Sequence, residues 1–127
     1  MTINGVSGSI VDSAYRVHSV LGPGLLESVY VAALACELEK RAVRVARQVA
    51  VPVVYEGTPL GAGFFADLIV EDQVIVEVKA TESLAPVHRR QLLTYLKLAD
   101  KRLGLLINFN EFLIKDGIVR IANRMPE

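Results

Sequence analysis

The sequence predicts an α/β protein in which two helices precede three antiparallel strands, a third helix, another strand and a small hairpin. Three observations predict this class. Apolar residues recur every three or four positions up to residue 41, which is the spacing of amphipathic helices. From Val43 to about Tyr55 the composition becomes rich in β-branched residues and partly alternating, as in a β-strand. A third helical segment is followed by a nearly continuous apolar run at residues 103–109, which is typical of a strand buried on both faces.

The two N-terminal helices are separated by a break that contains glycine and proline. Residues 7–21 place apolar side chains at helical intervals, and Gly22-Pro23-Gly24 then ends the helix. Helical spacing resumes over residues 25–41, which we expect to form the longest helix of the chain.

Three consecutive strands are expected next. The first covers residues 43–55, where Pro52 lacks an amide donor and therefore indicates a bulge or an edge strand. A turn leads to a second strand that ends near Val70. A polar turn at residues 71–73 joins it to a third strand at residues 74–79.

The last part of the chain is expected to contain a helix, the buried strand and a hairpin. The helix runs from Pro86 to about Ala99, because proline is favourable in the first turn of a helix. After the buried strand, Asp116-Gly117 predicts a tight turn that joins residues 112–115 to residues 118–121.

Length and composition indicate one ordinary domain, residues 1–127. Lys plus Arg and Asp plus Glu each number 14, so the chain lacks the positive charge of a tight, salt-sensitive DNA binder. An enzyme with an acidic site remains open, because a bound cation reverses the local charge. The single cysteine, Cys36, suits a reducing compartment, and neither a long apolar run nor a basic leader is present. We therefore expect a cytoplasmic protein with no membrane partner.

Two acids of the second and third strands are expected to face each other. The three-residue turn between these strands pairs Val70 with Val74, and this register places Asp67 opposite Glu77. Lys79 lies on the same face of the sheet, because side chains alternate along a strand. Two carboxylates in an apolar hairpin repel each other, so a positive charge must compensate them.

Either Lys79 or a divalent cation can supply that charge. Mg²⁺ prefers carboxylate oxygens and keeps waters in its other positions. Such an ion would polarise a phosphoryl oxygen and lower the pKa of a bound water, while Lys79 would position that water or stabilise the developing negative charge. This chemistry is phosphodiester hydrolysis. The alternative is an ordinary cross-strand ion pair between Lys79 and one of the acids, which would add little stability.

Two further polar pairs lie on the expected helices. Glu27 and Tyr30 are three residues apart, and Gln91 and Tyr95 are four residues apart, so each pair shares a helical face. Each also has an ordinary explanation. An acid in a first helical turn is favoured by the helix dipole, and a glutamine with a tyrosine is common at a helix surface.

The histidines and the basic side chains are assigned no catalytic role. His18 and His88 have no histidine or cysteine partners at the spacing of metal ligands. Arg89 and Arg90 could meet a phosphate backbone, although such a run is more often a solvated face.

Together these residues resemble the GxxExxY proteins, a small prokaryotic family within the PD-(D/E)XK nuclease superfamily, over about residues 10–121. Several spaced motifs in one order are more specific than any single motif. The resemblance rests on Val17-His18, Leu21-Gly22-Pro23-Gly24-Leu25-Leu26-Glu27-Ser28-Val29-Tyr30, Ala66-Asp67-Leu68, Val76-Glu77-Val78-Lys79-Ala80, Pro86-Val87-His88, Gln91-Leu92-Leu93-Thr94-Tyr95-Leu96 and Gly104-Leu105-Leu106-Ile107-Asn108-Phe109.

This resemblance implies a PD-(D/E)XK nuclease-like core of helix, three-stranded antiparallel meander, helix and strand. An additional N-terminal helix and a C-terminal hairpin would complete the α/β fold. The site residues that it implies are the metal ligands Asp67, Glu77 and Glu27, the catalytic Lys79, and the supporting residues Gln91, Tyr95 and Tyr30.

One position departs from the family pattern, since Phe65 stands where an arginine commonly precedes the Ala-Asp pair. The leading interpretation is a phosphodiesterase that uses Mg²⁺ or Mn²⁺ and acts on nucleic acid, either DNA or RNA. The neutral charge, the small size and Phe65 favour an alternative, a non-catalytic module that binds nucleic acid or a protein on the same fold. The apolar composition also allows a homo-oligomer, which is compatible with either function.

Overall fold

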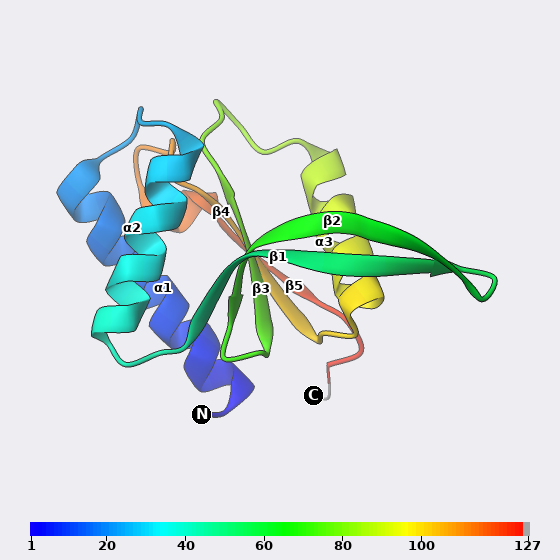
Figure 1. Cartoon of the computed structure of the whole chain (residues 1–127). Coiled ribbons are helices and arrows are strands. Elements are labelled where there is room, and N and C mark those ends of the chain that lie inside the picture. Colours follow the sequence, from blue (N-terminus) through cyan, green and yellow to red (C-terminus); the bar gives the residue numbers. More distant parts are fainter. Residues whose placement is uncertain (126–127) are drawn as a thin grey trace.

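A computed structural model describes residues 1–125, and these residues form a five-stranded sheet with helices on both faces (Figure 1). The strands lie side by side in chain order, and only β3 and β4 run parallel. The elements are α1 (Ile3–Leu21), α2 (Glu27–Lys40), β1 (Val45–Tyr55), β2 (Thr58–Val70), β3 (Val74–Lys79), α3 (Pro86–Ala99), β4 (Leu103–Asn108), the 3-10 helix η1 (Ile114–Gly117) and β5 (Ile118–Ala122). The α/β class and the order of helix, helix, three strands, helix and strand are confirmed.

The core consists of two layers of apolar side chains, one on each face of the sheet. One layer lies under α1 and α2 and includes Leu68, Val76 and Val78 from the sheet. The other lies under α3 and includes Ile69 and Ile75. Neighbouring residues of β2 and β3 therefore enter opposite layers, as the period of a strand requires. Every residue of β4 is buried, which confirms the expected strand with two covered faces.

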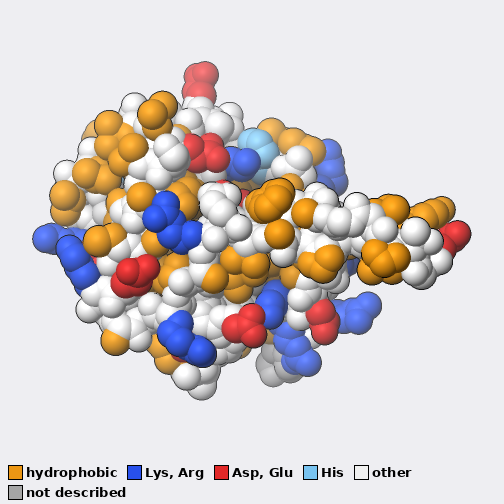
Figure 2. Space-filling model, viewed as in Figure 1, with side chains coloured by type: hydrophobic (Ala, Val, Ile, Leu, Met, Phe, Trp, Pro, Cys, Tyr) orange, Lys and Arg blue, Asp and Glu red, His pale blue; other side chains and the backbone are white. Residues whose placement is uncertain are grey.

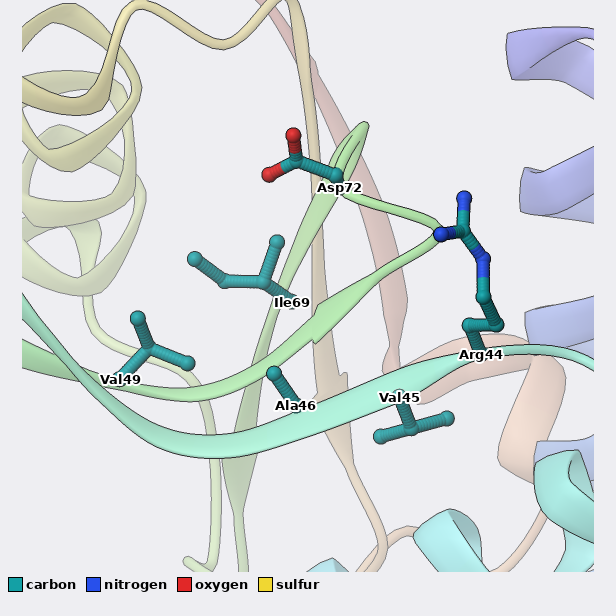
Figure 3. A pocket seen from close by; sticks show the side chains of 6 residues that line it. All are labelled: Arg44, Val45, Ala46, Val49, Ile69 and Asp72. Atoms are coloured by element: carbon teal, nitrogen blue, oxygen red, sulfur yellow. The ribbon is translucent and has the colours of Figure 1, made fainter.

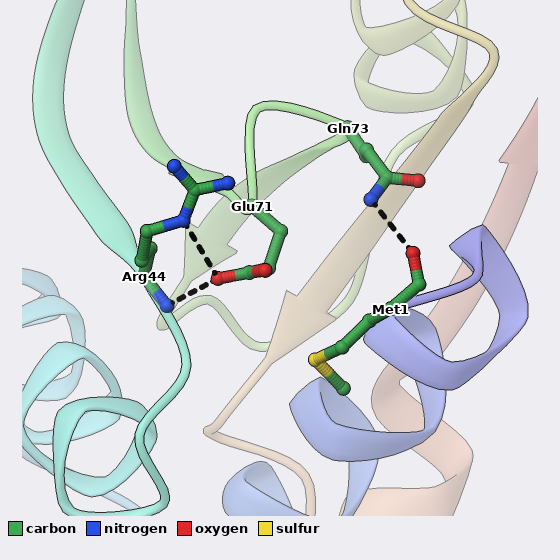
Figure 4. Close-up of polar contacts among 4 residues, drawn as sticks. All are labelled: Met1, Arg44, Glu71 and Gln73. Atoms are coloured by element: carbon green, nitrogen blue, oxygen red, sulfur yellow. Dashed lines mark hydrogen bonds and ion pairs between the residues drawn. The ribbon is translucent and has the colours of Figure 1, made fainter.

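The turn between β2 and β3 is held by contacts from outside the hairpin (Figure 4). One carboxylate oxygen of Glu71 accepts hydrogen bonds from the Arg44 amide at 2.6 Å and from Arg44 Nε at 3.3 Å. The side-chain amide of Gln73 donates to the Met1 carbonyl at 3.2 Å. The strands after this turn pair Val70 with Val74, which is the expected register. A shift of one residue would move every side chain of the hairpin to the other face.

The first helix begins earlier than the sequence predicted. Residue 7 was the expected start, whereas α1 begins at Ile3 because the Thr2 hydroxyl accepts the Gly5 amide and caps the helix. Gly5 and Gly8 lie inside the helix. At 19 residues α1 is longer than the 14-residue α2, so the prediction that the second helix is the longest was wrong. No helix within residues 1–125 combines the length and apolar content needed to cross a bilayer.

The outer halves of β1 and β2 form a hairpin arm, residues 49–66, that extends past α3 (Figure 1). β1 is the edge strand of the sheet, and its pairing with β2 shifts on both sides of Pro52. Both expectations for Pro52, a bulge and an edge, are therefore confirmed. Without an amide donor there, and with a broken register, the edge is protected against pairing with another strand.

The predicted C-terminal hairpin is wrong. Residues 112–115 form no strand, and β5 instead pairs antiparallel with β4 at the other edge of the sheet. Asp116-Gly117 belongs to the 3-10 helix η1, not to a hairpin turn. Gly117 is needed because a Cβ atom there would overlap the main-chain carbonyl of Asn108. The glycine at this position is therefore required by its close approach to the end of β4, and not by a hairpin turn.

Gly117→Ala is expected to lower the free energy of unfolding by about 1–3 kcal/mol, because main-chain atoms of β4 must shift to admit the methyl group. Chemical denaturation followed by circular dichroism measures this change. The matched control is Gly8→Ala in α1, where a Cβ meets no atom within 4 Å. That control should gain up to about 1 kcal/mol from helix propensity. Equal stability of both variants would contradict the close approach.

Candidate active site

The candidate site lies where the β2–β3 ladder ends. Main-chain pairing runs from Val70–Val74 to Leu68–Val76, and the next residues along the strands are Asp67 and Glu77. Asp67 Oδ2 accepts the amide of Val78 at 2.8 Å. This hydrogen bond fixes the direction of the carboxylate within the sheet.

A pocket of about 230 Å³ joins residues from five elements at this point. β2 and β3 supply the acids and the lysine, α3 forms a wall, β4 contributes one leucine, and the first residue of α2 completes the lining. Its lining residues are Glu27, Phe64, Phe65, Asp67, Glu77, Lys79, His88, Gln91, Leu92, Tyr95 and Leu106. Six of the seven site residues expected from the sequence therefore share one pocket.

Glu77 is the most unusual group in the pocket. It is only 8% exposed, and its Oε1 atom has no hydrogen-bond partner. Burial raises the pKa of Glu77 to about 9; the charge of Asp67 and a hydrogen bond shared with it act in the same direction, and Lys79 opposes them. In the absence of a cation Glu77 therefore holds its proton at neutral pH.

Lys79 does not compensate this pair by direct contact. Within residues 1–125 the ion pairs are Arg41–Glu37, Arg44–Glu71 and Lys101–Asp72. The alternative of an ordinary cross-strand ion pair is therefore not observed. Lys79 remains half-buried in the lining of the pocket, where its ammonium can face an anionic group.

The carboxylates suit a hard divalent cation, although they do not form a three-acid cage. No group of three or more His, Cys, Asp or Glu side chains is close enough to hold an ion within the described part of the chain. Asp67 and Glu77 are the adjacent pair, whereas Glu27 lines the pocket as an exposed residue. Mg²⁺ typically takes one or two protein carboxylates and keeps several waters. The unpartnered Oε1 of Glu77 fits this role.

Tyr30 is the expected site residue that the pocket does not include. Its ring is fully buried and stacks on Phe109, with centroids 4.7 Å apart. Its hydroxyl donates to the Gly22 carbonyl at 2.6 Å and accepts the Leu25 amide at 3.0 Å. Tyr30 therefore fastens the loop before α2, and through this loop it positions Glu27.

Gln91 and Tyr95 line the pocket from α3, as their spacing predicted. Tyr95 stacks on Phe64 with ring centroids 3.8 Å apart, which joins α3 to β2. Burial raises the pKa of Tyr95, and the negative charges of Glu77 and Asp67 add to this effect. The Tyr95 hydroxyl therefore stays protonated and can donate a hydrogen bond.

His88 and Asn108 were missed as contributors to the site. His88 also lines the pocket, and its Nδ1 accepts the Ala85 amide at 3.1 Å. It lies three residues before Gln91 on the same helix, a spacing that could have revealed it. Asn108 binds both the amide and the carbonyl of Thr81, at 3.1 and 2.9 Å, and so fixes the loop after Lys79.

A second pocket, of about 240 Å³, lies near the base of β1 (Figure 3). Its lining includes Val45, Val49 and Ile69, and the charged residues Arg44 and Asp72 of its rim are paired with Glu71 and Lys101. It has no unpaired acidic group. The pocket that contains Asp67 and Glu77 is therefore the candidate site.

Glu77→Gln is expected to flatten the pH dependence of stability of the metal-free protein. The folded chain holds the Glu77 proton up to about pH 9, whereas the ordinary pKa is 4.5. The stabilisation from this group is thus complete below the ordinary pKa and is lost as the pH rises through the folded-state pKa. Between about pH 5 and 9 the wild type should lose of the order of 1–3 kcal/mol more than the variant. Parallel unfolding curves would contradict the raised pKa.

Glu71→Gln is a control for which the opposite pH dependence of stability is expected. The Arg44 amide lowers the pKa of Glu71, so its stabilisation is present above the ordinary pKa and is lost as the pH falls. This variant should be less stable than the wild type at neutral pH and should approach it in acid. Thermal melting across the pH range measures both variants.

Comparison with known proteins places residues 4–121 in one family, described as the PD-(D/E)XK nuclease superfamily. Searches of curated proteins and of solved structures gave no significant match. The matched range contains every candidate site residue and nearly all of the sheet. The finer resemblance to the GxxExxY proteins stays a prediction. On this match, and with a five-stranded α/β fold of the expected order, the chain belongs to the PD-(D/E)XK nuclease superfamily.

Proposed function

We propose that the chain is a single nuclease-like domain with divalent-metal-dependent phosphodiesterase activity on nucleic acid. The observation that carries this proposal is the Asp67–Glu77 pair, in which Glu77 is buried and its Oε1 atom has no hydrogen-bond partner within residues 1–125. A buried carboxylate oxygen without a hydrogen bond is costly, and a cation is the ligand that best satisfies it. Nucleases of this superfamily generally use divalent metal ions, and we propose Mg²⁺ or Mn²⁺ here.

Asp67 and Glu77 would hold the ion. The ion would polarise a phosphoryl oxygen of the substrate and lower the pKa of a bound water. The Val78 amide keeps Asp67 directed into the site. Lys79 lies beside the acids, where its ammonium can stabilise negative charge that develops on the phosphate. Gln91 and the protonated Tyr95 hydroxyl offer hydrogen bonds from α3, and Glu27 faces the same pocket.

The alternative is a non-catalytic module that keeps the fold and binds nucleic acid or a protein. Equal numbers of acidic and basic residues, and an exposed Phe65 at the pocket, favour it. It does not account for a buried carboxylate oxygen that has no hydrogen-bond partner, beside a lysine that makes no ion pair, within the described residues 1–125. The two functions differ in whether binding survives removal of divalent metal.

Asp67→Ala is expected to abolish saturable binding of Mg²⁺ and Mn²⁺, because only one carboxylate of the pair remains. Titration calorimetry measures this loss. The apparent affinity of the wild type should rise with pH up to about pH 9, since the ion must displace the Glu77 proton. The matched control is Asp12→Ala, which removes an exposed acid of α1 and should bind metal normally. Unchanged binding in Asp67→Ala would rule out the proposed metal site.

Lys79→Ala is expected to bind metal but to lose at least about 100-fold in the rate of nucleic-acid cleavage, because Lys79 acts on the reacting phosphate. A gel assay with labelled DNA and RNA in Mg²⁺ and Mn²⁺ measures the rate. Lys115→Ala, an exposed lysine of η1, is the control and should cleave as the wild type does. A wild-type protein that cleaves no nucleic acid, yet binds it equally well in EDTA, would establish the non-catalytic alternative.

A further inference from the structure

Phe65 presents an exposed aromatic ring at the proposed metal site. Its side chain is 59% exposed, and it also lines the pocket that contains Asp67 and Glu77. It precedes Asp67 by two residues on β2, a separation of about 7 Å along a strand. This separation is on the scale of the distance between a phosphate and the base of the same nucleotide. A base could therefore reach the ring while its phosphate reaches the acids.

The other two aromatic rings of the pocket, Phe64 and Tyr95, stack on each other. Phe64 is buried and stacks on Tyr95, with their planes within 8° of parallel. The stacked ring pairs of residues 1–125 are Phe64–Tyr95 and Tyr30–Phe109. Phe65 takes part in neither, so its ring is free for a ligand.

The hairpin arm that carries Phe65 lacks the positively charged side chains with which proteins bind the phosphates of a duplex. Glu56 is the only charged residue between Arg47 and Asp67. Figure 2 shows mainly hydrophobic and neutral side chains along the projecting arm, with an acidic side chain at its tip. A duplex binder makes many phosphate contacts through Lys and Arg, and its affinity depends on them. Single strands are bound by stacking of their bases on aromatic rings together with a few positive charges near the backbone, which Lys79 and the proposed ion would supply here.

The volume of the pocket suits a small chemical group of the ligand better than a whole drug-sized molecule. Its volume of about 230 Å³ is below the range of about 300–1,000 Å³ found for pockets that enclose drug-sized molecules. A phosphate group and its metal ion can enter such a space, and the base of the same nucleotide would then lie outside it, at the exposed ring of Phe65.

We propose that this site binds unpaired nucleotides, and that Phe65 stacks on the base next to the phosphate held at Asp67 and Glu77. This inference rests on the proposed function and names its substrate class. Base stacking is available to single-stranded DNA and RNA alike, and the experiment below separates them.

The test measures fluorescence anisotropy with a labelled 12-nucleotide single strand, prepared as DNA and as RNA, and with the corresponding DNA duplex. Ca²⁺ replaces Mg²⁺, and a gel confirms that the strands stay intact. Phe65→Ala should weaken single-strand binding by about 5- to 100-fold, the effect of losing one stacked base. Phe65→Tyr keeps the aromatic face and should stay within about twofold of the wild type, whereas Phe65→Leu should lose most of the affinity.

Two controls separate stacking from other effects. Phe112→Ala removes a ring that is 87% exposed but lines a different pocket, with Tyr15 and His18, and it should bind single strands normally. The dependence of affinity on salt should be the same in Phe65→Ala and the wild type, because stacking releases no counterions from phosphate. Thermal melting checks that each variant is folded.

The inference is overturned if the wild type binds no single strand, if Phe65→Ala binds single strands as the wild type does, or if it loses equal affinity for the duplex. Cleavage of the same strands in Mg²⁺ is measured in parallel. Cleavage by the wild type with no effect of Phe65 would refute the stacking role and leave the phosphodiesterase standing. Binding that depends on Phe65 without any cleavage would support stacking and refute the phosphodiesterase.

Discussion

The juxtaposition of Asp67 and Glu77 depends on the β2–β3 turn, and the site depends on that juxtaposition. The contacts of Glu71 with Arg44, just before β1, and of Gln73 with Met1 hold this turn from two other parts of the chain. Arg44 and Met1 lie more than ten residues along the chain from Asp67 and Glu77, whose positions depend on these contacts. They matter because a hairpin that slipped by one residue would bury charged side chains among the apolar residues under α1 and α2.

The acidic pair is an unfavourable arrangement that the surrounding fold maintains. Its neighbours Ile69 and Ile75 are buried, and the Val78 amide compensates only one of the carboxylates. A proton on Glu77 is the simplest compensation in the protein alone. A cation would replace this proton and also satisfy Oε1. The affinity for a metal ion and the pKa of Glu77 therefore both depend on how the negative charge of the acidic pair is compensated.

Local patterns predicted most of the fold, because period, turn chemistry and proline position act over a few residues. β3 and α3 were placed at their observed bounds, and the register that opposes Asp67 to Glu77 followed from turn length. Long-range approach could not be predicted in the same way. The glycine at 117 is needed because β4 passes close to it, and no nearby residue signals this. For the same reason the contribution of Asn108 to the loop after Lys79 was missed.

The spacing of Glu27 and Tyr30 shows how one motif can combine two different roles. Sequence spacing puts both residues on one face of α2, yet Tyr30 turns into the core and Glu27 into the pocket. The tyrosine hydroxyl bridges Gly22 and Leu25, across a loop in which Gly22 and Gly24 adopt positive φ. Glycine tolerates this conformation with little strain. The loop can therefore close tightly enough to start α2 at Glu27, so the tyrosine acts on the site by positioning an acid and not by contact with a substrate.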